Sequence, residues 1–223
     1  MKFTLGSRLT AEFIGTAFLV AAVVGSGVMG EKLAGGNVAI ALLANTIATG
    51  AALVALILAF GAISGAHFNP VVTLAEAIDG GLTRKDASAY VAVQIVGGIA
   101  GAITAHLMFG LSVVSISLRA RPGWSLALSE FVATFGLLLV IFGCSRQRAS
   151  AVPFAVAAYI TAAYWFTAST SFANPAVTIA RSLSNTFAGI RPVDVPLFIA
   201  AQIVGGLAAT FLFRRLKPSP KAP

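Results

Sequence analysis

Long runs of apolar residues, broken by few polar ones, dominate this chain. Six runs are long enough to cross about 30 Å of hydrocarbon as helices: about residues 10–29, 36–62, 86–110, 125–145, 149–168 and 194–213. Two shorter apolar pieces, near residues 69–79 and 174–184, would each form about 15 Å of helix, half of that thickness. The pattern predicts an all-α membrane protein with six transmembrane helices and two half-helices.

Polar landmarks inside these runs recur in the same order in the two halves of the chain. The matching landmarks, at offsets of 118, 105 and 108 residues, are Glu12 with Glu130, Asn69-Pro70-Val71 with Asn174-Pro175-Ala176, and Gln94 with Gln202. Each half contains three full spans, so the second half must enter the membrane from the opposite side. We expect one channel domain, residues 1–223, built as an inverted repeat of about 8–110 and 124–214, with its site near the midplane.

The two Asn-Pro pairs lie where a helix should begin inside the membrane. Asn69 and Asn174 are good N-cap residues, because the side-chain oxygen accepts a bond from a free backbone N–H. Pro70 and Pro175 suit the first helical position, which needs no N–H. The N-termini of two such half-helices carry partial positive charge. Facing each other at mid-membrane, they would oppose cations and protons while neutral molecules pass.

The charges support a membrane protein and give it an orientation. Only 10% of the residues are charged, against about 25% in soluble domains. With both termini inside, ten Lys and Arg residues fall on the cytoplasmic side and five outside, as the positive-inside rule favours. This asymmetry explains the net charge of +8 better than nucleic-acid binding does, because no basic run is interleaved with stacking aromatics. We expect an integral protein of the cell (inner or plasma) membrane, in contact with lipid.

At these motifs the sequence resembles the aquaporin (major intrinsic protein) family. The resemblance rests on the segment 64–73, on Asn174-Pro175-Ala176 and on the repeated Glu and Gln-x-x-Gly-Gly landmarks, and it covers nearly the whole chain. It implies a homotetramer with one pore in each subunit, small neutral solutes as the permeant molecules, and neither a cofactor nor a metal. Val71 departs from the alanine that is usual in the family.

The resemblance also implies a selectivity filter of four positions on the outer side of the motifs. Counted from the motif asparagines, these are Thr49, Ala162, Ser171 and Val177, with a possible slip from Ala162 to Ala163. The family's usual aromatic residues and arginine are missing from this set. We therefore expect a wide filter that passes water, glycerol-like polyols and metalloid acids such as arsenous acid. Some bacterial members with a similar departure are linked to arsenic handling.

The remaining polar residues are interpreted as supports or as parts of the pore. Glu12, Glu130, Gln94 and Gln202 are expected to hold the unwound stretches beside the half-helices rather than to contact solute. The pore-lining candidates in those stretches are His67, Phe68 and Phe172. Arg181 lies one helical turn beyond Val177 and could reach back toward the filter. It could equally cap carbonyl groups near the end of its half-helix.

Three other functions remain as alternatives. A water-selective aquaporin would share the fold and differ only at the filter. A secondary transporter can also use inverted repeats and broken helices, but the sequence has no acidic cluster at the midplane to bind coupling ions. An intramembrane enzyme would need a nucleophile and base or metal ligands, and the two histidines lie far from any nucleophile motif. We therefore expect a channel and not an enzyme.

Overall fold

The computed structural model describes residues 3–216, and this part of the chain folds into helices joined by links, of which the one at residues 109–123 is long. The helices are α1 (Leu5–Leu33), α2 (Val38–Ser64), α3 (Pro70–Asp79), α4 (Arg84–Met108), α5 (Trp124–Gln147), α6 (Val152–Phe166), α7 (Pro175–Ser182) and α8 (Val195–Arg215). Short 3₁₀ turns, η1 (Ala149–Ala151) and η2 (Pro192–Asp194), lead into α6 and α8. The all-α prediction is confirmed.

Six helical segments are long and apolar enough to span a membrane: α1, α2, α4, α5, α6 together with η1, and α8 together with η2. Helices α3 and α7 are short. Local sequence accounts for several helix boundaries. The side chains of Asn37 and Thr83 accept backbone N–H bonds at the starts of α2 and α4. Gly65 and Gly80 follow α2 and α3 with φ of 90°, a left-handed conformation that glycine adopts without steric cost.

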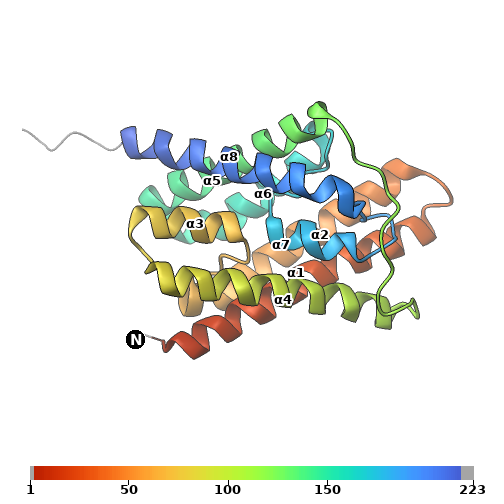
Figure 1. The fold of residues 1–223 in the computed structure, drawn as a ribbon, viewed down its shortest axis with the longest axis horizontal. Coiled ribbons are helices and arrows are strands. Elements are labelled where there is room, and N and C mark those ends of the chain that lie inside the picture. The colour runs from red at the N-terminus through yellow and green to blue at the C-terminus, as the bar shows by residue number, and fades with distance from the viewer. Residues whose placement is uncertain (1–2, 217–223) are drawn as a thin grey trace, which may run out of the picture.

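The two halves of the chain pack in the same way. Helix α1 contacts α2 and α4, and α5 correspondingly contacts α6 and α8. A methyl group at Gly97 or Gly205 would lie 2.5 Å from the carbonyl oxygen of Phe13 or Phe131, so only glycine permits these close helix crossings. Helices α3 and α7 lie end to end in the middle of the bundle (Figure 1), and each packs against long helices of both halves.

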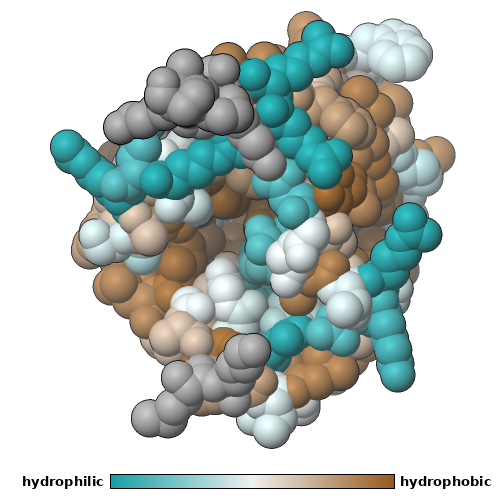
Figure 2. Space-filling model, turned by 90° about the vertical axis from the view of Figure 1, so that its left-hand side faces the viewer, coloured by the Kyte–Doolittle hydropathy of each residue, from teal (hydrophilic) through white to brown (hydrophobic). Residues whose placement is uncertain are grey.

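Both ends of the described chain lie at one end of the bundle, here called the terminal end (Figure 1). The links at residues 34–37 and 109–123 lie at the opposite end, here called the far end. Figure 2 looks onto the terminal end, where hydrophilic side chains stand around the rim and apolar ones lie deeper. Large apolar side chains on the long helices point outward, among them Phe18, Leu58 and Leu128, as expected of an integral membrane protein.

Candidate pore

The half-helices α3 and α7 begin as the sequence predicts. Asn69 Oδ1 accepts a bond of 2.9 Å from the backbone N–H of Val71, and Asn174 Oδ1 accepts one of 2.9 Å from Ala176. Pro70 and the matching Pro175 stand at the first helical position. Each asparagine therefore satisfies a donor that would otherwise be unpaired at a helix start inside the membrane.

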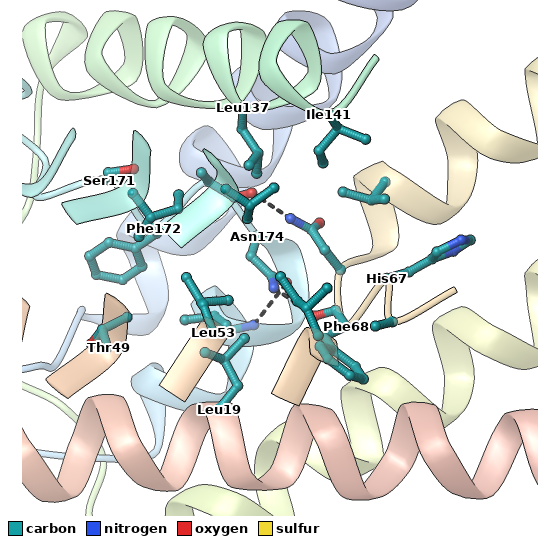
Figure 3. Close-up of a pocket in the computed structure, with 18 of the residues that line it drawn as sticks. Leu19, Thr49, Leu53, His67, Phe68, Leu137, Ile141, Ser171, Phe172 and Asn174 are labelled. Carbon is teal, nitrogen blue, oxygen red and sulfur yellow. Dashed lines mark hydrogen bonds between the residues drawn. The ribbon is translucent and has the colours of Figure 1, made fainter. Parts of the chain in front are cut away.

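The same two asparagines link the halves of the chain. Asn69 Nδ2 donates to the carbonyl oxygen of Ala173, and Asn174 Nδ2 donates to that of Phe68, each over 2.7 Å. Figure 3 draws these bonds as separate dashed lines near Asn174, in the middle of the cavity. Each amide nitrogen has two hydrogens and donates one of them in this link. Both asparagines line the cavity, so the second hydrogen of each can be donated to a molecule inside it.

The stretches before each asparagine have a backbone that non-glycine residues rarely adopt. Ala66, Phe68, Ser171 and Ala173 all have φ of 48–49°, a left-handed conformation that costs roughly 1–2 kcal/mol per residue. Surrounding contacts must therefore hold these stretches in place.

Two buried carboxylates provide those contacts. Glu12 accepts the backbone N–H groups of His67 at 2.9 Å and Phe68 at 2.7 Å. Glu130 accepts those of Phe172 at 2.9 Å and Ala173 at 2.8 Å. Both glutamates are fully buried, and neither lines the central cavity. Their contacts suit the supporting role expected from their matched positions.

The glutamines complete the same support in each half. Gln94 Nε2 donates to Glu12 at 2.8 Å and to Thr73 at 2.9 Å. Gln202 Nε2 donates to Glu130 at 2.6 Å and to Thr178 at 2.9 Å. The threonines were not singled out from the sequence, although their matched positions after the Asn-Pro pairs could have identified them.

A central cavity of about 350 Å³ passes the two asparagines. Its wall takes one face from each neighbouring helix: Leu19 and Val23 from α1, Thr49, Leu53 and Ile57 from α2, Leu137 and Ile141 from α5, and Val152, Val156, Ile160 and Tyr164 from α6. Figure 3 shows Thr49, Ser171 and Phe172 at one end of the cavity and His67 at the other, with Asn174 between them. The wall is thus largely apolar, with polar groups along the half-helix side.

Three of the four residues expected in the filter line this cavity, and the fourth does not. Thr49, Ser171 and Val177 are buried and line it, whereas Ala162 is exposed on the outside of α6. Two residues along a helix correspond to about 200° of rotation, so Ala162 faces away from the side that carries Ile160 and Tyr164. Tyr164, and not Ala162, lines the cavity from this part of α6.

An aromatic hydroxyl therefore enters the region where the sequence predicted only small side chains. The hydroxyls of Tyr164 and Thr49 lie 3.2 Å apart and form a buried hydrogen bond across the cavity wall. Ser171 Oγ is also buried, and within residues 3–216 it has no hydrogen-bond partner. The wall here offers hydroxyls from three segments beside the methyl groups of Val177.

Arg181 reaches the same region from one turn farther along α7. Its guanidinium carbon lies 3.3 Å from the centre of the Phe172 ring, and its Nε donates to the carbonyl oxygen of Ala188. The side chain is 2% exposed and lines the cavity. The guanidinium borders the cavity, and its carbonyl partner, Ala188, belongs to the link after α7 rather than to the end of α7 itself.

His67 and Glu76 both line the cavity, and Figure 3 shows His67 at the end opposite Thr49 and Ser171. The His67 ring nitrogen Nδ1 lies 3.0 Å from Thr73 Oγ1. Glu76 was missed from the sequence, although it lies 105 residues before Arg181, the same offset that relates the two asparagines. Among the described residues, no three His, Cys, Asp or Glu side chains are grouped so that they could hold a metal ion.

Comparisons with known proteins agree with this geometry. The chain matches the Major intrinsic protein family over residues 2–164. It is 54% identical to aquaglyceroporin AqpS of Rhizobium meliloti (strain 1021) over 96% of this chain and 92% of that protein. It is 29% identical to the probable aquaporin AqpM of Archaeoglobus fulgidus over 97% and 99% of the two chains.

The fold has a close counterpart among solved structures. The X-ray structure of the aquaglyceroporin from Plasmodium falciparum superimposes with a TM-score of 0.76, at 19% identity, over 96% of this chain and 97% of that one. At this identity the likeness concerns the fold alone. Together with the family match and the long alignment to AqpS, it leads to one conclusion: this chain belongs to the major intrinsic protein family, a family of membrane channels.

Proposed function

We propose that this protein is a passive channel for small uncharged solutes: water, glycerol-like polyols and metalloid acids such as arsenous acid. The observation that carries the proposal is the pair of asparagines at the starts of α3 and α7. Each lines the cavity, caps its helix through Oδ1, and has one amide hydrogen left after donating the other across the halves. A hydroxyl oxygen passing through the centre can accept hydrogen bonds from both.

The same centre opposes the passage of ions. The N-termini of α3 and α7 face each other there, and their partial positive charges repel cations. Glu12 and Glu130, which hold the unwound stretches, are engaged by backbone N–H groups and do not line the cavity. Stripping water from an ion costs on the order of 20 kcal/mol in the ideal limit, and an apolar wall returns little of it.

We assign the selectivity filter to Thr49, Tyr164, Ser171 and Val177. Three of these residues carry hydroxyl groups and the fourth carries methyl groups, which suits a compact solute with several hydroxyls. Val177 stands where the family usually has an arginine, so no guanidinium crosses the pore at that position. The name of the relative AqpS, an aquaglyceroporin, supports polyol passage over strict water selectivity.

The setting of the channel follows from family and charge. We propose a homotetramer in the cell membrane with both termini in the cytoplasm, so that the far end faces outward. The excess of Lys and Arg on the segments assigned to the cytoplasm supports this orientation. The outward-facing apolar residues of the long helices would contact lipid and neighbouring subunits.

Stopped-flow light scattering on proteoliposomes tests the proposal. After an osmotic jump with glycerol, and separately with arsenous acid, the vesicles should shrink and then reswell quickly in a protein-dependent way. Asn69→Leu/Asn174→Leu, which removes both central donors, should abolish the fast reswelling. Fast shrinkage without reswelling would instead identify a water-selective channel. Saturable uptake driven by an ion gradient would identify a transporter.

A further inference from the structure

A second cavity, of about 300 Å³, lies at the far end outside the filter. Its lining combines residues of α2, α5 and α7 with parts of the links at residues 109–123, 167–174 and 183–191: Val38, Leu42, Asn45, Arg119, Ala120, Arg121, Leu126, Ala168, Thr170, Arg181 and Phe187. Three of these residues are arginines, and we call the cavity the arginine vestibule. Arg181 also lines the central cavity, so one guanidinium borders both spaces.

Aromatic rings hold the three guanidinium groups in place. The Arg181 and Arg121 guanidinium carbons lie 3.3 and 4.8 Å from the centre of the same ring, that of Phe172. The Arg119 guanidinium carbon lies 5.2 Å from the centre of the Phe187 ring. At 3.3 Å the Arg181 group must lie nearly flat on its ring, so its N–H groups point sideways and not into the aromatic face.

Most of the N–H groups of these arginines have no partner among residues 3–216. The Arg181 side chain donates only through Nε, to Ala188, although it has five N–H groups and is 2% exposed. Arg121 uses Nε and Nη1, which donate to the carbonyl oxygens of Gly189 and Ser169. Within those residues, no side-chain hydrogen bond is formed by the Arg119 guanidinium.

The positive charges of the vestibule are also left without a carboxylate partner. In the described part of the chain, the ion pairs are Arg8 with Asp86, Arg191 with Asp194, and Arg214 with Asp79, so none includes a vestibule arginine. Asp194, a nearby acid, accepts the backbone N–H of Arg121 while its side chain pairs with Arg191. Burial, and then the charge of Arg119, lower the pKa of Arg121 to about 10, so it remains protonated at neutral pH.

We propose that the arginine vestibule is a binding site for a small oxyanion, such as a carboxylate, sulfate or phosphate group. Planar guanidinium groups with free N–H edges match the paired oxygens of such anions. A negative charge there would relieve the crowding of three cations, and the size of the cavity limits the ligand to a small one. An anion held by Arg181 would lie directly above the filter. This inference goes beyond neutral-solute conduction and does not depend on it.

Equilibrium dialysis of radiolabelled sulfate against the purified full chain in detergent, at low and constant ionic strength, tests the site. The informative variant is Arg119→Gln, because this side chain is exposed and its loss should leave the fold intact. The matched control is Lys32→Gln, which removes one positive charge at the same end from an exposed residue outside the vestibule. We expect saturable binding that Arg119→Gln weakens about tenfold, a usual scale for one charge-assisted hydrogen bond, while Lys32→Gln changes it less than twofold.

Three results would overturn the proposal. The first is no saturable binding, and the second is equal binding by the wild type and Arg119→Gln. The third is an equal loss in Arg119→Gln and Lys32→Gln, which would indicate attraction to the charged surface in general. Because binding is measured without any flux, these results are distinguishable from a failure of channel activity in the vesicle assay.

Discussion

The two half-helix segments are held by the same kind of hydrogen bonds, but they place different side chains toward the two ends of the cavity. In each half, a buried glutamate accepts two backbone N–H groups, a glutamine links that glutamate to a threonine, and an asparagine caps the half-helix. Two residues before the asparagine, however, the first half has His67 and the second has Phe172. Seven residues after it, the first has Glu76 and the second has Arg181.

The shared hydrogen bonds serve the backbone, whereas the residues that differ between the halves can serve the solute. An unwound stretch inside a membrane must have its N–H groups satisfied, and that requirement is the same in both halves. Side chains beyond the first turn of α3 and α7 do not have to meet this hydrogen-bond requirement. One end of the cavity can therefore carry a carboxylate and the other a guanidinium. The following predictions test the shared support first and the differing mouths afterwards.

The largest expected effect is on stability, from Glu12→Gln and Glu130→Gln. Each change removes an acceptor from a buried backbone N–H group, and an unsatisfied buried group costs about 1–3 kcal/mol. Both variants should unfold at clearly lower temperature by circular dichroism in detergent. Glu12→Gln should lose slightly more, because Glu12 also accepts a bond of 2.6 Å from Ser64 Oγ. Glu31→Gln, at an exposed position, is the control, and equal stability of all three would contradict the supporting role.

The next effect is on proton exclusion, from Asn69→Asp and Asn174→Asp. An aspartate can still accept the capping N–H bond, but it places a negative charge at the facing helix N-termini and loses the amide donor to the carbonyl of the other half. We expect proton permeability, measured with a pH-sensitive dye inside liposomes, to rise about tenfold, which corresponds to about 1.4 kcal/mol off the barrier. The two variants should behave alike because the two sites are alike. A proton leak in only one of the two variants would contradict the claim that Asn69 and Asn174 contribute equally to proton exclusion.

At the far mouth, Val177→Arg should reduce glycerol flux more than water flux. A guanidinium at this position would cross the pore and narrow it between Thr49 and Ser171. We expect a loss of glycerol permeability of about tenfold, equal to about 1.4 kcal/mol in barrier height, measured by light scattering. Val177→Leu adds bulk without charge and should cause a smaller loss. Unchanged glycerol flux in Val177→Arg would place the filter elsewhere.

A smaller effect is expected from Tyr164→Phe, which removes the hydroxyl that bonds to Thr49. The loss of one buried hydrogen bond should cost about 0.5–1.5 kcal/mol of stability and change glycerol flux by about twofold. Tyr159→Phe on the same helix is the control, because the Tyr159 hydroxyl contacts Val132 and lies outside the cavity. Equal glycerol flux in both variants would contradict the assignment of Tyr164 to the filter.

The smallest effect concerns the pH dependence of sulfate binding in the arginine vestibule. Arg121 carries its charge below a pKa of about 10 and loses it above. Binding should therefore weaken about threefold as pH rises through 10, the scale of one partly exposed charge. Arg121→Gln should bind more weakly at pH 7 and lose less binding over the same rise in pH. A step of the same size in Arg121→Gln would assign it to another group.

The sequence by itself determined the helices, the half-helices and the internal repeat. Their signals are local: the length of an apolar run sets a span, and Asn-Pro starts a helix through its own side chain and ring. The matching positions of Glu12 and Glu130 in the two repeats also predicted that these residues would share a supporting role. Such statements hold because they need only neighbouring residues or a comparison of the two halves.

Only the tertiary structure decided which side chains meet at the far mouth. The run from residue 149 to 180 has no charge to mark an inward face of α6, so its rotation is set by packing against α2 and α5. That rotation brings Tyr164, not Ala162, to the cavity. Likewise, Arg181 meets Arg119 and Arg121 only because the link at residues 109–123 folds back over α7. The count from Asn174 back to α6 crosses the unwound stretch at residues 167–173, whose length in space depends on its dihedral angles, and it misses the cavity-lining residue Tyr164 by two positions.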